Sequence, residues 1–323
     1  MILDEAEKVS LNNIWVYGVG GVGGYFGGKM ACAVARQGLA SRKVFFIARG
    51  RHLEEILKKG LTLNASDQTG MICKPELATG NAAELPPPDL CLICVKSYDL
   101  DRVVERLAET IKDETVLIPL LNGVDIHERV RSLLNRGTVL PACVYVGTHI
   151  EKAGVVTQKG GDGTILCGPD PDVPGFAPGA VIQFFRDVGI RLVWQNDPYK
   201  AIWEKYIFIA SFGLVTALFR KTLGEVLSDQ MARELVRGIM TEIVSLARQR
   251  GIDLAEDIVD ISLKKALGFP YETKTSFQRD VETKGGRHEG DLFGATIFRI
   301  GRALDIETPV TRSVYEKLLR TIE

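Results

Sequence analysis

The feature that most constrains this chain is a glycine-rich segment near its start, and it matches the pattern G-x-G-x-x-G: Gly18-Val19-Gly20-Gly21-Val22-Gly23. Residues 13–17 before it form a short apolar run that predicts a strand, and the residues after it predict a helix that continues to Gly38. In this context the glycines allow a tight turn, a close approach to a pyrophosphate, and close helix-to-strand packing. The segment therefore predicts a dinucleotide site; the competing interpretation is a flexible glycine-rich turn.

The second predicted strand covers residues 43–48, and Arg49, Gly50 and Arg51 follow it directly. At this position a site selective for NAD carries an acidic side chain that binds the ribose 2′-hydroxyl. An arginine instead forms paired hydrogen bonds with a 2′-phosphate, which a carboxylate would repel. The sequence therefore favours NADP, and the competing interpretation of Arg49 is an ordinary surface arginine.

The first two thirds of the chain alternate strand-like and helix-like patterns, which is typical of a parallel sheet covered by helices. Further apolar runs predict strands from near residue 61 and at 90–95, 115–121, 139–146 and 190–194. Two polar residues follow such runs, Lys96 after 90–95 and Asn122 after 115–121. Because open α/β sheets bind ligands at the carboxyl ends of their strands, both residues are candidates for the site. The competing interpretation for each is a solvated loop residue.

From Asp197 onward the apolar residues take helical spacing. Asp197-Pro198 predicts the start of a helix that continues to about Phe219. Ser228 predicts the start of another, which ends at Gly251 and has one apolar face: Met231, Leu235, Ile239 and Ile243. Thr308-Pro309 predicts the start of the last helix. The fold class is thus α/β, with an N-terminal Rossmann-type NADP-binding domain (1–196) and an all-helical C-terminal substrate and catalytic domain (197–323).

Composition excludes several classes of protein. The 323 residues are 46% hydrophobic and 25% charged, which is typical of a globular chain. Forty Lys plus Arg oppose 41 Asp plus Glu, and no basic stripe suits nucleic acid. The longest apolar stretch, 206–219, is shorter than the ~20 residues that span a bilayer, so it predicts a core helix and no membrane partner. A polar N-terminus and cysteines within apolar runs predict a cytoplasmic protein.

Neither cysteines nor histidines predict a metal site. Cys91 and Cys94 have C-x-x-C spacing, but residues three apart on a strand point to opposite faces, so we expect buried thiols. The four histidines show no metal-ligand spacing and include His127 and His288. Periodicity leaves open whether the helix from Ser228 packs within its domain or against a second copy, so the chain is expected to be a monomer or a homodimer.

Six motifs in order make the chain similar to one family: Gly18 to Gly23, Ala48-Arg49-Gly50, Val95-Lys96, Leu121-Asn122-Gly123, Trp203-Glu204-Lys205 and Ser276-Phe277-Gln278-Arg279-Asp280. In nearly its whole length the chain resembles the ketopantoate reductase (2-dehydropantoate 2-reductase) family. The resemblance implies a Rossmann domain, a helical domain, and NADPH-dependent reduction of 2-dehydropantoate to (R)-pantoate, a step of pantothenate and coenzyme A biosynthesis.

The resemblance also assigns roles to individual residues. It implies that Lys205 and Glu289 are catalytic, and that the glycine motif and Arg49 bind cofactor. Lys96 and Asn122 lie on the cofactor side and also contact substrate, as do Lys205, Glu289 and Ser276. The chemistry fits Lys205 independently of the family. An ammonium can polarise the carbonyl of a 2-oxo acid and then give its proton to the forming alkoxide.

The chain departs from the family four and eight residues after the catalytic lysine, where asparagines are common. Here those positions are Ile209 and Gly213. Each lost amide lowers kcat/KM for a substrate that it would have bound by a factor of roughly 10 to 100, unless Ser211, Thr216, Ser276 or a water replaces it. The sequence therefore supports two alternatives to ketopantoate reduction. One is an NADPH-dependent reductase of another branched 2-oxo acid, and the other is a non-catalytic NADP(H)-binding sensor.

Overall fold

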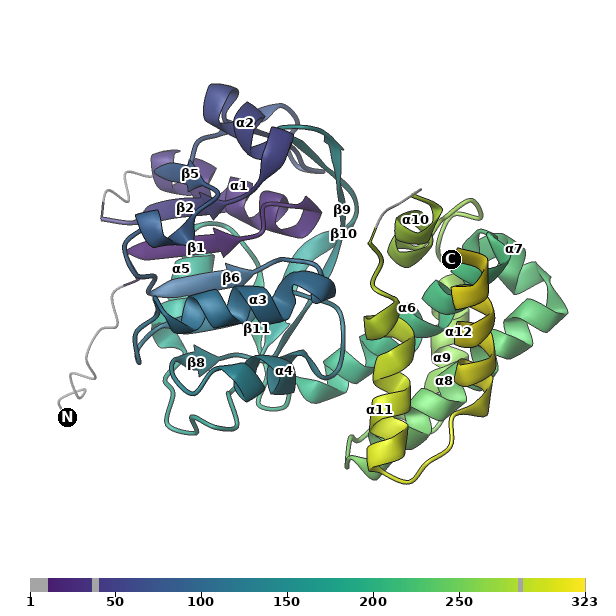
Figure 1. Cartoon of the computed structure of the whole chain (residues 1–323). Coiled ribbons are helices and arrows are strands. Elements are labelled where there is room, and N and C mark those ends of the chain that lie inside the picture. Colours follow the sequence, from purple (N-terminus) through teal and green to yellow (C-terminus); the bar gives the residue numbers. More distant parts are fainter. Residues whose placement is uncertain (1–10, 37–40, 284–286, 323) are drawn as a thin grey trace. The chain divides into compact units, whose positions relative to one another are not determined.

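The computed structural model describes residues 11–36, 41–283 and 287–322, which divide into two compact units (Figure 1). The N-terminal unit runs to Leu121 and resumes over Ile126–Pro198, and the helical unit consists of Asn122–Asp125 and the chain from Tyr199 onward. A short segment between a strand and a helix of the first unit therefore belongs by its contacts to the second. The predicted helix end at Gly38 lies outside the described residues.

A parallel sheet of six strands forms the centre of the N-terminal unit, in the order β5-β2-β1-β6-β7-β8. The strands are β1 (Asn13–Tyr17), β2 (Lys43–Ile47), β5 (Leu77–Thr79), β6 (Leu90–Ile93), β7 (Val116–Pro119) and β8 (Thr138–Val139). β1 and β6 are buried at almost every position, as expected for strands covered on both faces. Because β2 lies on one side of β1 and β6 on the other, the chain reverses its order beside β1, where such sheets bind ligands.

A second sheet, of mixed direction, was not predicted. Its strands are β3 (Leu61–Asn64), β4 (Met71–Cys73), β9 (Ala142–Lys152), β10 (Val155–Cys167) and β11 (Leu192–Trp194), and β9 pairs antiparallel with β10. The prediction of a single strand at 139–146 was therefore wrong, because β8 ends at Val139 and a second strand, β9, begins at Ala142 and continues to Lys152. Helix α1 (Gly21–Arg36) contacts strands of both sheets, which requires glycines on its surface. A Cβ on Gly24 would lie 2.6 Å from Val156, and one on Gly27 would lie 2.9 Å from Phe46.

The remaining elements of the N-terminal unit connect the strands. They are α2 (Gly50–Lys59), η1 (Ala82–Glu84), α3 (Ser97–Ala108), α4 (Ile126–Leu133) and α5 (Gly179–Asp187). Phe184 and Phe185 of α5 are fully buried in the same hydrophobic core as β1 and α1. This arrangement agrees with the expected α/β class.

The helical unit contains no strand among its described residues. Its elements are α6 (Tyr199–Phe219), α7 (Leu223–Ser228), α8 (Gln230–Gln249), α9 (Ile258–Ala266), α10 (Ser276–Glu282), the π-helical turn η2 (Asp291–Ala295), α11 (Thr296–Ala303) and α12 (Pro309–Ile322). The helices predicted from Asp197 and from Thr308 are confirmed to within two residues. Among the described helices, α6 alone is long and apolar enough to cross a membrane, and 67% of its apolar window is buried within the structure.

The helix predicted from Ser228 to Gly251 is α8, whose start is also confirmed to within two residues. Ser228 ends α7, and the side chain of Asp229 caps α8 by accepting a hydrogen bond from the Ala232 N–H. α7 itself was missed, although its capping box is visible in the sequence as Thr222 followed three residues later by Glu225. The predicted apolar face of α8 is confirmed at Ile239 and Ile243, which are fully buried, but not at Met231, which is 61% exposed.

Candidate active site

The glycine loop begins where β1 ends. Gly18 has φ +94°, which disfavours any side chain, and its N–H donates to the Ile47 carbonyl at 2.9 Å. A Cβ on Gly23 would lie 2.0 Å from the Gly18 carbonyl oxygen, so only glycine fits there. A Cβ on Gly20 would meet nothing within 4 Å, which leaves this part of the loop open. The loop is closed toward the sheet and open outward, as a pyrophosphate at a helix N-terminus requires.

The other residues of the motif have packing roles. Val19 is part of the hydrophobic core and Val22 packs against it. Gly21 begins α1, whose first turn carries no acidic side chain that would oppose an anion. The observed loop therefore fits the dinucleotide that the motif predicts.

Arg49 lies between β2 and α2, and 73% of its side chain is exposed. Its Nη2 donates to Oδ2 of Asp99 at 2.7 Å, and Asp99 is buried in the first turn of α3. This ion pair orients the guanidinium but leaves further N–H donors of its planar fork for a phosphate. Lys96 is half-buried and directly precedes α3, three residues after β6 ends. Both basic side chains thus lie at the carboxyl edge of the parallel sheet.

Lys205 and Asn122, which are 83 residues apart, form a direct hydrogen bond in the helical unit. Lys205 Nζ, on the second turn of α6, donates to Asn122 Oδ1 at 2.7 Å, and both residues are half-buried. An amide oxygen is an acceptor that favours a charged ammonium. The structure therefore brings together two residues that the sequence singled out for separate reasons, and it orients the lysine.

Glu289 is buried, with 6% of its area exposed, and lies two residues before η2. The next segment is joined to α6, because Tyr206 Oη donates to the Leu292 carbonyl at 2.7 Å. Burial raises the pKa of Tyr206 well above its usual value, so the phenol remains a neutral donor. The carboxyl-bearing segment is thus attached to α6 one residue after Lys205.

Ser276 is exposed at the first position of α10. The residue before it, Thr275, makes the contact with α6: its Oγ1 lies 2.8 Å from Thr216 Oγ1 and accepts from the Gln278 N–H at 3.1 Å. The role of Ser276 in binding substrate therefore stays a prediction, and Thr275 is a residue that sequence reasoning missed. Its signal was available, since threonine is a preferred residue immediately before a helix.

The two positions that lack asparagine differ in their surroundings. Ile209 is half-buried, one helical turn after Lys205 and so on the same face of α6. Gly213 is buried, and a Cβ there would lie 3.6 Å from Phe277 and 4.0 Å from Phe293, which leaves room for a methyl group but not for an amide. Phe277 and Phe293 also contact each other, with ring centroids 4.9 Å apart.

The two hydroxyl groups of α6 near these positions do not take the place of the missing amides. Thr216 Oγ1 donates to the Phe212 carbonyl of the preceding turn at 2.7 Å. Ser211 is fully buried, and its Oγ has no hydrogen-bond partner among the described residues. The face of α6 beyond Lys205 is therefore more apolar than the family pattern implies.

A second polar network begins three residues after Asn122, and it was not predicted from the sequence. Asp125, three residues after Asn122, is 8% exposed, and its Oδ2 accepts from Arg299 Nη2 at 2.9 Å and from Thr296 Oγ1 at 3.2 Å. Arg299 Nη1 donates to Asp291 Oδ1 at 2.9 Å. Asp125 and Arg299 are 174 residues apart, so no sequence pattern signals this contact.

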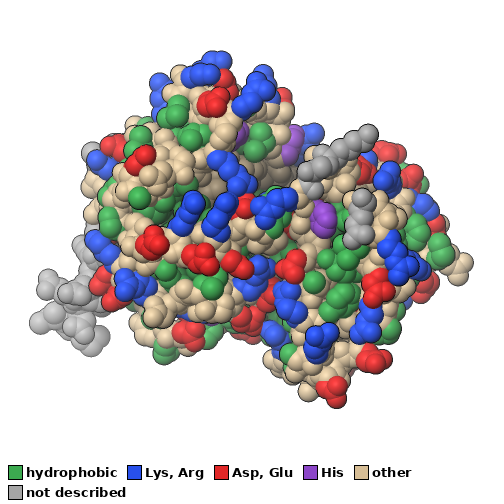
Figure 2. Space-filling view, viewed as in Figure 1, with side chains coloured by type: hydrophobic (Ala, Val, Ile, Leu, Met, Phe, Trp, Pro, Cys, Tyr) green, Lys and Arg blue, Asp and Glu red, His purple; other side chains and the backbone are tan. Residues whose placement is uncertain are grey.

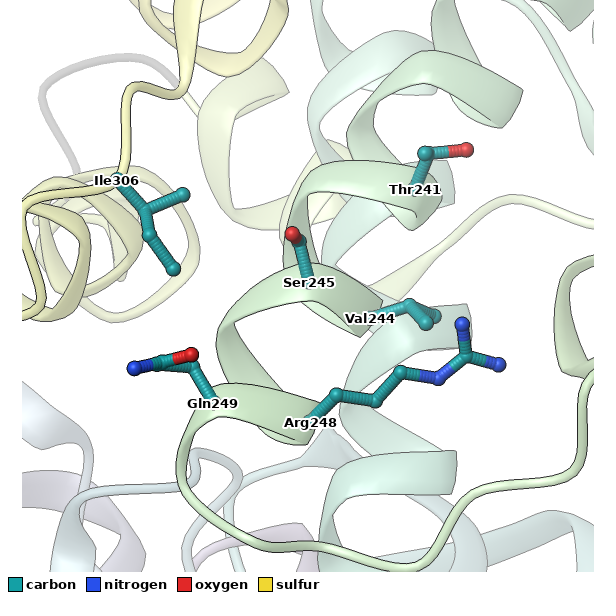
Figure 3. Close-up of a pocket in the computed structure, with 6 residues that line it drawn as sticks. All are labelled: Thr241, Val244, Ser245, Arg248, Gln249 and Ile306. Atoms are coloured by element: carbon teal, nitrogen blue, oxygen red, sulfur yellow. The ribbon is translucent and has the colours of Figure 1, made fainter.

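A hollow of about 350 Å³ on the helical unit is lined by none of these residues. Figure 3 shows side chains of α8 lining it on one side and Ile306 on the other. The guanidinium of Arg248 donates to the carbonyls of Ala255 and Glu256. The hollow contains none of the predicted site residues and lacks a carboxylate or a lysine, so it has no means for the predicted chemistry.

His127, Asp170 and Asp172 offer ligand atoms within 4.8 Å of one another in the N-terminal unit. The guanidinium of Arg131 already pairs with both carboxylates, and His127 Nε2 lies 3.0 Å from Asp170 Oδ1. Burial alone raises the pKa of Asp170, but hydrogen bonds from His127, Arg131 and two backbone N–H groups outweigh it and lower the pKa to about 2. Asp170 is therefore the buried centre of a network of ion pairs and hydrogen bonds that joins α4 to the residues after β10, with the exposed Asp172 at its edge.

Charge on the visible face follows no single sign. Figure 2 shows basic and acidic side chains interspersed over each unit, with hydrophobic side chains between them. This agrees with the near-neutral composition of the chain.

Comparisons with known proteins match almost the whole chain. The family model described as Ketopantoate reductase PanE/ApbA matches residues 14–172, and its C-terminal counterpart matches residues 197–323. A 2-dehydropantoate 2-reductase of Archaeoglobus fulgidus is 29% identical over 88% of this chain and 91% of its own length. An uncharacterised oxidoreductase of Bacillus subtilis is 27% identical over 94% and 96%. A solved ketopantoate reductase of Ralstonia eutropha superposes with a TM-score of 0.85 at 26% identity, covering 96% and 98%.

Proposed function

Because the chain belongs to the ketopantoate reductase family, we propose that it reduces 2-dehydropantoate to (R)-pantoate with NADPH, a step toward pantothenate and coenzyme A. It is an enzyme of the 2-dehydropantoate 2-reductase type, a class of NADP-dependent oxidoreductases acting on the CH–OH/C=O pair. Residues 1–196 bind the cofactor and residues 197–323 supply substrate binding and catalysis, in the cytoplasm and in a monomer or homodimer. The observation that carries the proposal is the Lys205–Asn122 hydrogen bond of 2.7 Å.

Lys205 is the general acid of the proposed reaction. When bound, a nicotinamide cofactor would supply the hydride that the 2-oxo carbon accepts, and negative charge would then develop on the carbonyl oxygen. The ammonium of Lys205 donates a hydrogen bond to that oxygen and then transfers its proton, so that the alkoxide becomes a hydroxyl and the lysine becomes neutral. Asn122 Oδ1 holds the ammonium in place before transfer. Glu289 binds the lysine or the substrate hydroxyl, and Lys96 and Ser276 complete the set of substrate contacts.

Arg49 and the glycine loop bind the cofactor in this proposal. The loop residues Gly18 to Gly23 receive the pyrophosphate at the start of α1. Arg49, oriented by Asp99, binds the 2′-phosphate and gives the preference for NADPH over NADH. Replacing Arg49 with glutamine should weaken NADPH binding about tenfold or more while leaving NADH binding nearly unchanged, and fluorescence titration with both cofactors measures the difference.

A second candidate substrate is a branched 2-oxo acid without the terminal hydroxyl. The observation that favours it is the apolar face of α6, where Ile209 is half-buried and Gly213 packs against Phe277. A site built to bind a hydroxyl rejects an analogue without one, whereas an apolar site discriminates little. The two candidates therefore predict different preferences for one matched pair of substrates.

The deciding experiment follows NADPH oxidation with ketopantoate and with trimethylpyruvate, which has a hydrogen in place of the ketopantoate hydroxyl. A much higher kcat/KM for ketopantoate supports the first proposal, and a comparable or higher value for trimethylpyruvate supports the second. Tight NADPH binding without turnover of either acid, or of a wider panel of 2-oxo acids, would refute both and favour the cofactor sensor.

A further inference from the structure

The segment Asn122–Asp125 joins a strand to a helix of the N-terminal unit but packs with the helical unit. Within the part of the chain that the structure describes, none of its backbone N–H groups donates a hydrogen bond to a backbone carbonyl. Its position depends on side chains instead: Val124 is buried, Asn122 accepts from Lys205, and Asp125 accepts from α11. Asp125 thus anchors the segment to α11 three residues after Asn122.

Arg299 is the group that completes this anchor. Its Nη2 bonds with Asp125 Oδ2 at 2.9 Å and with Thr296 Oγ1 at 2.7 Å, while its Nη1 bonds with Asp291 Oδ1 at 2.9 Å. Asp291 is two residues after Glu289. One planar guanidinium thus joins the segment that carries Asn122 to the segment that carries Glu289. A lysine, which has a single compact charge, can pair with Asp125 but does not reproduce this planar two-armed contact.

We propose that Arg299 is a positioning residue for the reaction, acting through Asp125 and Asp291 to hold Asn122 and Glu289 around Lys205. This inference rests on the proposed function, since it assigns Arg299 to the same site. Arg299 itself touches neither Lys205 nor Asn122 in any hydrogen bond the structure shows among the described residues. Half of its side chain is exposed, but the Asp125 carboxylate is only 11% exposed, so a variant without a cation at this position would leave that carboxylate buried without its cationic partner.

The first test does not depend on turnover. Hydrogen exchange of backbone amides is measured by mass spectrometry in the wild-type protein, in Arg299→Gln, and in Arg302→Gln as a matched control on the same helix. We expect the peptide that spans residues 122–133, which adds the hydrogen-bonded amides of α4 to the segment, to exchange at least about tenfold faster in Arg299→Gln and at the wild-type rate in Arg302→Gln. Unchanged exchange in Arg299→Gln would overturn the proposal, whatever substrate the enzyme uses.

The second test separates positioning from a general contribution to folding. Arg299→Lys keeps a cation beside the buried carboxylate of Asp125, so its melting temperature should stay near wild type. Because it loses the two-armed contact, we expect its kcat to fall about 10-fold to 100-fold, with the Kd for NADPH unchanged. A wild-type kcat in Arg299→Lys would mean that Arg299 only neutralises Asp125, and would overturn the proposal.

A double-mutant cycle with Asn122→Ala identifies the path of the effect. If Arg299 acts through Asn122, the change Arg299→Lys should lower kcat in the wild-type background but much less once Asn122 is alanine. Equal effects in both backgrounds would show that Arg299 does not act through Asn122 and would overturn that arm of the proposal. If the wild-type enzyme reduces no 2-oxo acid, the proposed function fails, and the hydrogen-exchange test still decides whether Arg299 orders the segment.

Discussion

The glycine loop and the Lys205 site are held in place by different forces. The loop is fixed by its backbone: the Gly18 N–H bonds with a neighbouring strand, and Gly23 touches the Gly18 carbonyl with no space for a side chain. The Lys205 site is fixed by polar and charged side chains from distant parts of the chain, including Asn122 and Arg299. Substitutions that add atoms should therefore disturb the loop more than substitutions that change charge. At the Lys205 site, substitutions that change charge should have the larger effect.

Lys205→Ala should have the largest effect of the changes considered. Removing a general acid lowers kcat by about 100-fold to 10,000-fold. Because the change affects charge in the helical unit, the Kd for NADPH should stay near the wild-type value. Steady-state kinetics with the preferred 2-oxo acid and fluorescence titration with NADPH measure both quantities.

The matched control is Lys200→Ala. Lys200 lies on the same helix, and its ion-pair partner Asp253 is almost fully exposed. This variant should leave kcat within about twofold of wild type, since exposed ion pairs contribute little. Equal losses of kcat in the two variants would show that α6 responds to any loss of charge, and Lys205 would lose its special role.

Gly23→Ala should have the next largest effect, and it tests the loop. The new Cβ would meet the Gly18 carbonyl at 2.0 Å, so the backbone must shift, at a cost of about 1–3 kcal/mol in the free energy of unfolding. Gly20→Ala adds the same methyl group where nothing lies within 4 Å, so stability should not change. Both variants should bind NADPH more weakly, the first through the loop's shape and the second through contact with the cofactor. Chemical denaturation and NADPH titration separate these causes, and a destabilised Gly20→Ala would contradict the account.

The same difference explains what the sequence could predict. The glycine loop, β1 and the switch to helices were predictable because each depends on residues close together in the chain: 13–17 is apolar and the glycines follow at once. β10 was missed because its middle, 158–163, is polar and glycine-rich and shows no alternation. The contact of Asp125 with Arg299 could not be predicted, since it joins residues 174 apart that no periodic pattern relates.

The N-terminal unit contains one region that should behave like the Lys205 site. Asp170 has a pKa of about 2 in the folded protein against a usual value of 3.8. A carboxyl with a lowered pKa stabilises the fold fully above its unfolded pKa and loses that contribution as pH falls toward its folded pKa. Asp170 should therefore contribute about 2 kcal/mol above pH ~4 and progressively less down to pH ~2.

Acid unfolding of Asp170→Asn tests this value. The variant should be less stable than wild type at neutral pH, and its stability should fall less steeply between pH ~4 and pH ~2. Asp172→Asn is the control, because that carboxylate is 62% exposed and should change little. If the free energy of unfolding depended on pH in the same way in Asp170→Asn and in wild type, Asp170 would not be the source of the acid sensitivity of the N-terminal unit.

Ile209→Asn should have the smallest effect and the most informative one for the substrate. It restores an amide on the half-buried face of α6 that Lys205 shares, without adding charge. If that face contacts the substrate, the ratio of kcat/KM for ketopantoate to that for trimethylpyruvate should rise about tenfold, the effect of one new hydrogen bond. Gly213→Asn cannot serve the same purpose, because its amide would meet Phe277 and should mainly lower stability. An unchanged ratio in a stable Ile209→Asn variant would show that this face of α6 does not determine which substrate is preferred. The contribution of α6 to the reaction would then be the charge of Lys205.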